Sequence, residues 1–305
     1  MKKIKKEIQE ATPEKEIKKE TTKKGVLIMA IGDAFWGKLA YNLLMSLRVT
    51  DPAIRVSLAH HGNGVSHLAQ HQRIAFDNII QIPDEYVHRS DHYEPIKAKM
   101  FMYKLSPYQE TLFLDADLIW LPRRSISEFF STQTNDLAFQ CRGLTDISVN
   151  TELLWCRTAQ IRQYAGVNKG AWHNLSSEAV YFKKTKETGI FFREAEKEYD
   201  KIDFPHVLFN GSIPDELPFG ITLLKNGLKM NEWHPVYWEH EQKKRLEPAQ
   251  MYQNFWAYSM GGNHQDRNMK NFYDNLVKYY AQKWNETGLT FWRDKQSWQP
   301  LRTSV

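Results

Sequence analysis

The sequence predicts an α/β fold, with a mostly parallel sheet flanked by helices and a helical extension at the C-terminus. Three observations lead to this prediction. Short apolar runs alternate with segments of helical periodicity in the first half of the chain, as in strand–helix–strand units. These runs are continuous, which is typical of parallel strands buried on both faces. The chain has 305 residues, 42% of them hydrophobic and 25% charged, which is a globular composition.

The expected elements follow in chain order. Apolar runs predict buried strands, and apolar residues spaced three and four apart predict helices. In the first half we expect strands at 25–33, 54–62, 77–83 and 111–122, and helices at 35–48, 65–74 and 96–109, the last ending near Pro107. In the second half we expect strands at 137–143 and 178–184, helices at 188–201 and within 213–227, and a mainly helical region at 246–305.

Charge divides the chain into a basic tail and a nearly neutral body. Residues 2–24 contain nine Lys and five Glu, which leaves 32 basic and 31 acidic residues elsewhere. We therefore expect a disordered tail at 1–24, a main domain at 25–245, and an extension at 246–305 that completes the functional site. A nucleic-acid binder should have a basic folded body, so nucleic acid is not the favoured partner, although the tail could tether the protein to RNA or a membrane.

The sequence gives limited information about the cellular compartment and the partners of the protein. No run approaches the roughly 18 apolar residues of a membrane span. The two cysteines, Cys141 and Cys156, are too few for a disulfide scaffold or a cysteine zinc cluster, so we expect a cytoplasmic protein. The sequence does not predict an oligomeric state.

The most informative segment is 112–117, with the sequence LFLDAD. Apolar residues bring the chain out of the core, and Asp115 and Asp117 follow at positions i and i+2, which strand alternation places on one face. Two such carboxylates repel each other unless a cation lies between them. Mg²⁺ or Mn²⁺ suits these oxygen ligands and commonly shares them with substrate phosphates. The alternative is a solvated Asp-Ala-Asp turn.

The stretch KAKMFMYKLSPYQETLFLDADLIWL, at 97–121, resembles the core of GT-A-fold nucleotide-sugar glycosyltransferases, particularly the family 8, glycogenin-like group. The resemblance implies a Rossmann-like GT-A domain at 25–245. It implies that Lys99, sixteen residues before Asp115, contacts the donor diphosphate. It also implies that Asp115 and Asp117 hold Mn²⁺ or Mg²⁺, with Ala116 in the same donor-binding segment.

In the resembling fold, the loop after the first strand holds the nucleobase and ribose of the donor. Ile31, Gly32 and Asp33 occupy that place here, followed by Phe35 and Trp36. Glycine allows close backbone approach, the carboxylate can accept hydrogen bonds, and an aromatic ring can stack on the base. The alternative is that Trp36 is an ordinary core residue.

The resemblance continues, with substitutions, in the second half. Asp215 and Glu216 stand where the family has an Asp-Gln pair that opens a helix near the sugar and acceptor, which makes them candidate catalytic residues. The family's Asn-Ser-Gly segment is altered to Ser-Ser-Glu at 176–178, before the expected strand. His264 and Lys270 keep the six-residue spacing of the motif His-x-x-Gly-x-x-Lys-Pro-Trp, although its Gly and Pro are replaced. The resemblance implies that His264 is a third metal ligand and that Lys270 binds phosphate.

Four histidines form a separate cluster. His60 and His61 end the second expected strand, where either could approach a nucleotide. His67 and His71 lie at i and i+4 of an expected helix, a spacing that can bind zinc, but the Glu of the His-Glu-x-x-His motif is absent. Surface helix histidines are the favoured interpretation.

These features together favour a metal-dependent enzyme that transfers a sugar from a nucleotide-diphospho-sugar, UDP-linked, to an acceptor. The acceptor, whether glycan, protein or small molecule, is not identified by the sequence. Retention of the anomeric configuration is implied by the resemblance alone. The alternatives are a nucleotidyltransferase acting on a sugar phosphate, which needs similar carboxylates and cations, and a non-catalytic α/β binding module.

Overall fold

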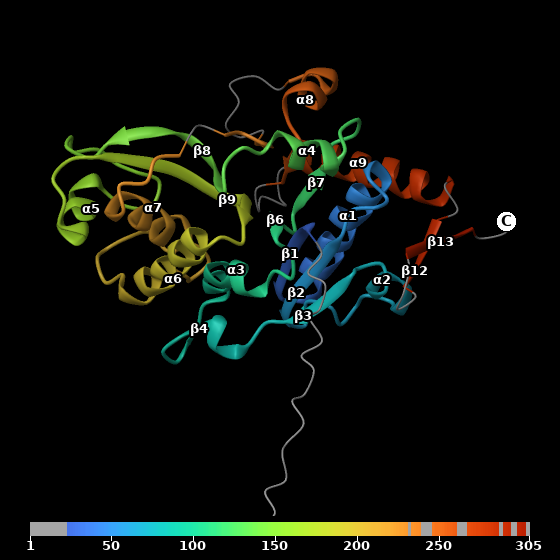
Figure 1. Ribbon diagram of the computed structural model, residues 1–305, viewed down its shortest axis with the longest axis horizontal. Helices are drawn as coiled ribbons and strands as arrows, with labels where there is room; N and C mark the ends of the chain where they lie inside the picture. The colour runs from blue at the N-terminus through green and yellow to red at the C-terminus, as the bar shows by residue number, and fades with distance from the viewer. Residues whose placement is uncertain are drawn as a thin grey trace, which may run out of the picture.

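A six-stranded sheet lies at the centre of the protein (Figure 1). The computed structural model describes residues 23–230, 233–238, 246–260, 267–286, 289–293 and 298–302. The strand order is β3-β2-β1-β6-β9-β8, in which the first four strands are parallel and β9 runs antiparallel to both of its neighbours. The predicted mostly parallel α/β sheet is therefore confirmed.

In the described residues, the strands form two principal sheets and two short pairs. The large sheet contains β1 (Lys24–Gly32), β2 (Val56–Gly62), β3 (Asn78–Gln81), β6 (Glu110–Asp115), β8 (Leu137–Asp146) and β9 (Ala171–Lys183). A three-stranded sheet contains β10 (Val236–Trp238), β11 (Ala257–Ser259) and β7 (Leu118–Trp120), in that order. The pairs are β4 (His88–Arg89) with β5 (His92–Tyr93), and β12 (Leu289–Arg293) with β13 (Trp298–Arg302).

Helices surround the large sheet. The α-helices are α1 (Ala34–Thr50), α2 (Gln70–Arg73), α3 (Met102–Leu105), α4 (Ile126–Thr132), α5 (Thr158–Ala165), α6 (Lys186–Lys201), α7 (Glu216–Lys225), α8 (Pro248–Asn254) and α9 (Arg267–Glu286). Two 3₁₀ helices are η1 (Asp84–Tyr86) and η2 (Pro95–Phe101). Within the described ranges, no helix has the length and apolar character needed to cross a membrane.

The large sheet is buried on both faces, which explains its continuous apolar runs. In β1, Val26 and Ile28 point into one core, and Leu27 and Met29 point into the other. Helices α1, α4 and α9 contribute to the first core, whereas η2, α6 and α7 contribute to the second. Figure 1 shows α5, α6 and α7 gathered at the β8–β9 end, with α1 and α9 at the opposite side. The three-layer arrangement follows from this two-sided burial.

Two glycines bring α1 and the loop after β2 against the end of β1. A Cβ atom on Gly37 would lie 1.8 Å from the carbonyl oxygen of Gly64. A Cβ atom on Gly64 would lie 2.3 Å from the carbonyl oxygen of Ala30. Any side chain at either position would collide with backbone, so these glycines allow the loop to cross the carboxyl end of β1.

Two expected helices are much shorter in the structure than predicted. Over 65–74, only α2 is helical, because the first half of that stretch belongs to the loop after β2. Over 96–109, η2 precedes the single turn α3. Its buried residues include the pairs Lys97/Met100 and Ala98/Phe101, and this three-residue repeat suits a 3₁₀ helix rather than an α-helix.

The remaining differences between the predicted and the observed elements concern where strands begin and end. The expected strand 111–122 is two strands in different sheets, because β6 pairs with β1 as far as Asp115 and β7 pairs with β11. Both halves are buried, so the apolar run does not mark the break. The expected strand 178–184 begins earlier, at Ala171, which places 176–178 inside β9 rather than before it. The predicted C-terminal helical extension is confirmed by α8 and α9, and the described part of 246–305 also contains the short strands β11, β12 and β13.

Candidate active site

The candidate active site lies where β1 and β6 end. Asp115 is the last residue of β6 and is in register with Met29 of β1. Ligands of open α/β sheets bind outside the carboxyl ends of the parallel strands. Lys99, on η2, reaches this edge, with its Nζ 2.8 Å from Asp115 Oδ2 and 3.2 Å from Asp215 Oδ2. Asp215 immediately precedes α7, as the sequence predicts.

Ser177 completes this network from β9. Lys99 Nζ donates a hydrogen bond to Ser177 Oγ at 3.1 Å, and the Ser177 hydroxyl donates to Asp215 Oδ2. The structure therefore brings together Lys99, Asp115 and Asp215, which the sequence singles out separately. The contact of Lys99 with Asp215 and the role of Ser177 are not predicted by the sequence, since no local spacing links residues so far apart in the chain.

Burial and neighbouring charges control ionisation at this edge. Burial raises the pKa of Asp115 to about 7, with Asp117 adding to the rise and Lys99 opposing it. Burial also raises the pKa of Glu216 to about 8, with the charge of Asp215 adding to the rise. Burial alone would lower the pKa of Lys99, but Asp115 and Asp215 outweigh it and raise the pKa above its usual value. Lys99 is therefore a permanent cation among carboxyl groups.

Glu178 is a further member of the site that sequence reasoning does not predict as functional. Its Oε1 accepts a hydrogen bond from Ser259 Oγ at 3.1 Å, and its buried Oε2 has no hydrogen-bond partner in the described part of the chain. Burial, followed by the charges of Asp117 and Asp115, raises the pKa of Glu178 well above its ordinary value. A carboxyl group directly before the apolar run Ala179–Phe182 was the available signal.

The carboxylate oxygens of the site are suitable ligands for a divalent cation. The charge of Asp117 raises the pKa of Asp115, and both aspartates raise the pKa of Glu178, so the three carboxyl groups lie close together. Hard oxygen ligands of this kind suit Mn²⁺ or Mg²⁺. The unpartnered Oε2 of Glu178 is a further buried acceptor. Among the described residues, however, no three Asp, Glu, His or Cys side chains are already arranged to hold a metal ion. Asp115 and Asp117 remain the candidate ligands.

The predicted third ligand, His264, lies outside the described residues, as do Gly261 and Gly262. Described residues on both sides of this segment lie near Asp117. The Met260 backbone N donates to the Asp117 carbonyl oxygen at 3.4 Å. On α9, burial raises the pKa of Tyr273, and the nearby charge of Asp117 adds to the rise. Ligation by His264 stays a prediction.

The predicted nucleotide loop lies at the end of β1. Ile31 and Gly32 are half-buried, and Gly32 has a φ of 97°. Asp33 is exposed, and its Oδ1 accepts a hydrogen bond from the backbone N of Phe35 at 2.9 Å, so it caps α1. Trp36 packs against the core, whereas Phe35 is 41% exposed. Phe35 is therefore the more available ring for stacking, and contact with a base or ribose stays a prediction.

Two other predicted donor-binding residues have different surroundings. Ala116 is buried in the turn between β6 and β7. Lys270 is exposed on α9, where its Nζ lies 2.6 Å from Oδ2 of Asp274, one turn along the helix. In the described ranges, Lys270 pairs with Asp274 and makes no ion pair with Asp115 or Asp117. Phosphate binding by Lys270 would require this pair to open.

The histidine cluster does not form a helical metal site. His67 precedes α2 and His71 lies in it, so the two histidines do not share a helix. His61 Nε2 lies 2.8 Å from Asp84 Oδ1. Burial, followed by the neighbouring His61 and Arg73, lowers the pKa of His60 and favours its neutral form.

A cavity of about 290 Å³ opens beside Glu216. It lies between β8, β9 and the start of α7, and its walls combine indole rings with polar groups. The lining includes Arg142, Trp155, Trp172, His173, Asn174 and Glu216. This mixture of flat apolar faces and a few polar groups is typical of small-molecule sites.

Comparison with known proteins supports the fold. No family model matches the chain, and no curated protein matches its sequence. The structure of the bifunctional glycosyltransferase WbbM in its apo form has a TM-score of 0.55 at 14% identity, covering 85% of this chain and 50% of that one. The structure of the galactosyltransferase LgtC in complex with donor and acceptor sugar analogues has a TM-score of 0.51 at 14% identity, covering 83% and 95%.

These similarities confirm the predicted fold class. The chain has the GT-A fold of these glycosyltransferases, with its six-stranded sheet and flanking helices. It spans about half the length of WbbM. At 14% identity the likeness concerns the fold, so activity must be argued from the site.

Proposed function

We propose that the protein is a metal-dependent glycosyltransferase that takes a sugar from a UDP-linked donor and delivers it to an acceptor. One observation carries this proposal: the ammonium of Lys99 lies between Asp115 and Asp215 at the carboxyl edge of parallel strands. This arrangement offers one cation for phosphate and separate carboxylates for a metal ion and for the sugar. The GT-A fold provides the same edge as its ligand-binding side.

Each residue has a distinct proposed role. Lys99 is poised to stabilise negative charge on the departing nucleotide diphosphate. Asp115 and Asp117 would hold Mn²⁺ or Mg²⁺, which supplies further charge neutralisation to the leaving group. Asp215, oriented by Lys99 and Ser177, would contact the sugar. Ile31, Gly32 and Asp33 would hold the nucleoside.

Glu216 replaces the Gln of the resembling family, and its environment offers a reason why this is tolerated. With a pKa raised to about 8, Glu216 keeps its proton at neutral pH. A protonated carboxyl group has one donor and one acceptor, as needed to replace an amide beside a sugar hydroxyl. We therefore propose that Glu216 acts as a neutral hydrogen-bonding group next to the cavity that it lines.

The acceptor is proposed to enter through this 290 Å³ cavity. Trp155 supplies a flat face and Asn174 a polar group, whereas Trp172 and His173 also line the cavity but are buried. Such walls suit a sugar or another small polar ring better than a polyanion.

The test is release of UDP from a panel of UDP-sugars with Mn²⁺, supported by thermal shift, since a bound ligand raises apparent stability. Slow UDP release that disappears in Asp117→Asn supports the proposal. Pyrophosphate release from a nucleoside triphosphate and a sugar phosphate would show a nucleotidyltransferase instead. If neither UDP nor pyrophosphate is released, the remaining alternative is a non-catalytic binding module. Proton NMR of the transferred sugar determines the anomeric configuration, for which we expect retention.

A further inference from the structure

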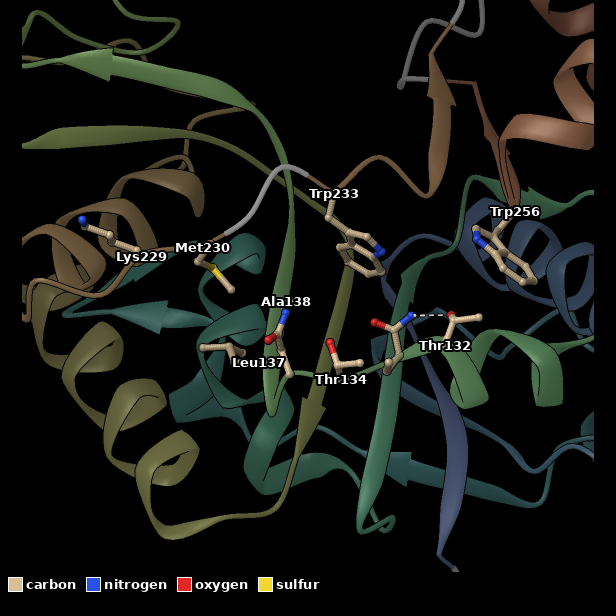
Figure 2. Close-up of a pocket in the computed structure, with 10 residues that line it drawn as sticks. Thr132, Thr134, Leu137, Ala138, Lys229, Met230, Trp233 and Trp256 are labelled. Carbon is tan, nitrogen blue, oxygen red and sulfur yellow. Dashed lines mark hydrogen bonds between the residues drawn. The ribbon is translucent and has the colours of Figure 1, made fainter.

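A larger cavity, of about 530 Å³, opens where α4 ends and β8 begins. Figure 2 shows Trp233 and Trp256 side by side at this space, with Thr132 below and between them and Thr134 below Trp233. The other walls come from the α4–β8 connection and from the segment after α7, and include Thr132, Asn135 and Lys229. We call this cavity the tryptophan groove. Neither Lys99 nor any carboxylate of the candidate active site lines it.

The two indole rings are held in place by the core beneath them. Both pack against Phe129, with ring centroids 5.8 Å away for Trp233 and 5.4 Å away for Trp256. The Trp233 carbonyl oxygen accepts a hydrogen bond from Cys141 N at 3.0 Å, and Trp256 N donates to Pro235 O at 2.8 Å. The rings would therefore meet a ligand without first losing conformational freedom.

The groove is not simply a place where tryptophan fills the core. Trp120 is an ordinary core residue, since it is only 1% exposed. Its ring centroid lies 5.7 Å from that of Trp256. Trp233 and Trp256 are only half-buried, and each lines the cavity. The Arg124 guanidinium lies 4.4 Å from the centroid of the Trp256 ring, so Trp233 is the ring that offers an outer face for stacking above this packed base.

The chemistry of the walls points to one class of ligand. Indole surfaces suit the flat C–H faces of sugar rings. The α4–β8 connection supplies hydroxyl and amide groups from Thr132, Gln133, Thr134 and Asn135, which can pair with sugar hydroxyls. The lining includes one cation, Lys229, and no carboxylate, so neither a polyanion nor a metal ion is favoured. A volume of about 530 Å³ falls within the range of about 300–1,000 Å³ for ligand sites.

We propose that the tryptophan groove is a second binding site, for a neutral oligosaccharide. Ala138 in its wall pairs with Tyr181 of β9, and Glu178 of the candidate active site lies three residues earlier on the same strand. Three residues of strand span about 10 Å, so a glycan chain in the groove would lie a short way from the transfer site. This inference concerns binding and stands whether or not the protein transfers sugar.

The test uses the full chain with three neutral probes that differ in linkage or in sugar unit: maltoheptaose, cellohexaose and N-acetylchitohexaose. Saturation-transfer NMR and tryptophan fluorescence should detect at least one of them at millimolar affinity or tighter. Trp233→Ala removes one stacking face, and Thr134→Arg places a large side chain in the groove from an exposed position. Each should weaken binding by about tenfold or more.

Two controls separate the groove from other sites. Ser131→Arg introduces the same side chain at an exposed neighbour that does not line the groove, and it should leave binding unchanged. Binding should also persist in Asp115→Asn and in excess UDP, which excludes the candidate active site. Failure to bind any of the three probes, or equal binding by wild type and Thr134→Arg, would overturn the proposal. Absence of UDP release by the wild-type protein, with glycan binding retained, would instead refute only the proposed transferase activity.

Discussion

Replacing Lys99 by Met tests the centre of the candidate active site. The change removes an ammonium that lies 2.8 Å from Asp115 Oδ2 and 3.2 Å from Asp215 Oδ2. Removing one partner of a buried ion pair costs about 3–5 kcal/mol, because the remaining charge is uncompensated. The Lys99 and Asp115 side chains retain 17% and 21% of their exposure, so we expect about 3 kcal/mol, at the low end of this range.

The same change should alter activity and its pH dependence. Loss of one preorganised positive group at a developing charge typically lowers kcat by about 10²–10³-fold, and we expect that loss in UDP release. Lys99 also opposes the rise in the pKa of Asp115, which lies at about 7. Without Lys99 this pKa should rise further, so the ionised carboxylate would form only at higher pH. The rising limb of the pH–rate profile should therefore move to higher pH.

Lys97→Met is the matched control. Lys97 lies two residues earlier on η2 and is also buried, but its Nζ contacts the His88 carbonyl oxygen at 2.8 Å and Asp200 Oδ1 at 2.9 Å. Both variants should unfold at lower denaturant concentration, and only the Lys99 variant should lose turnover. If UDP release by the two variants agrees within about twofold at saturating donor and Mn²⁺, the electrostatic role of Lys99 is refuted.

Four further predictions test other parts of the molecule. Asp115→Asn and Asp117→Asn remove charge without changing side-chain size and should abolish UDP release while the fold persists, so a wild-type rate in limiting Mn²⁺ would contradict their role as ligands. Glu216 has a pKa of about 8 when folded and about 4.3 when unfolded, so the folded state binds the extra proton and stability should fall as pH rises between these values. Glu216→Gln should reduce this loss of stability with rising pH. Melting curves of the wild type that are the same at pH 5 and pH 8 would disprove the prediction. Gly37→Ala would place a Cβ atom 1.8 Å from a backbone oxygen and should lower the free energy of unfolding in denaturant by about 1–3 kcal/mol, whereas an unchanged unfolding midpoint would contradict this close approach. His264→Ala should raise the Mn²⁺ concentration needed for half activity, and an unchanged titration would remove His264 from the site.

Local patterns predicted much of the framework. The run in β1 is apolar throughout because both of its faces are covered, and that signature is visible without knowing the neighbours. Helix α6 was predicted from the spacing of Phe191, Phe192, Ala195 and Tyr199, all of which are buried. The edge position of Asp115 follows from its place at the end of an apolar run.

Other features could not be predicted because their cause is not local. The apolar stretch that contains β6 and β7 breaks at Ala116 and Asp117 since each half pairs with a different sheet. A single run of buried residues looks the same whether it belongs to one sheet or two. The groove between Trp233 and Trp256 likewise depends on two separate segments meeting over Phe129.

The sequence by itself determined most of the buried strands and the long helices, and that Asp115 and Asp117 lie at the end of a buried strand. Burial on two faces and helical periodicity leave direct marks on neighbouring residues. Only the tertiary structure decided that Lys99 meets Asp215 and Ser177, and that Glu178 is buried with an unpartnered oxygen beside the aspartates. Lys99 and Ser177 are 78 positions apart, and charges at such separations interact through space after the sheet and helices have packed.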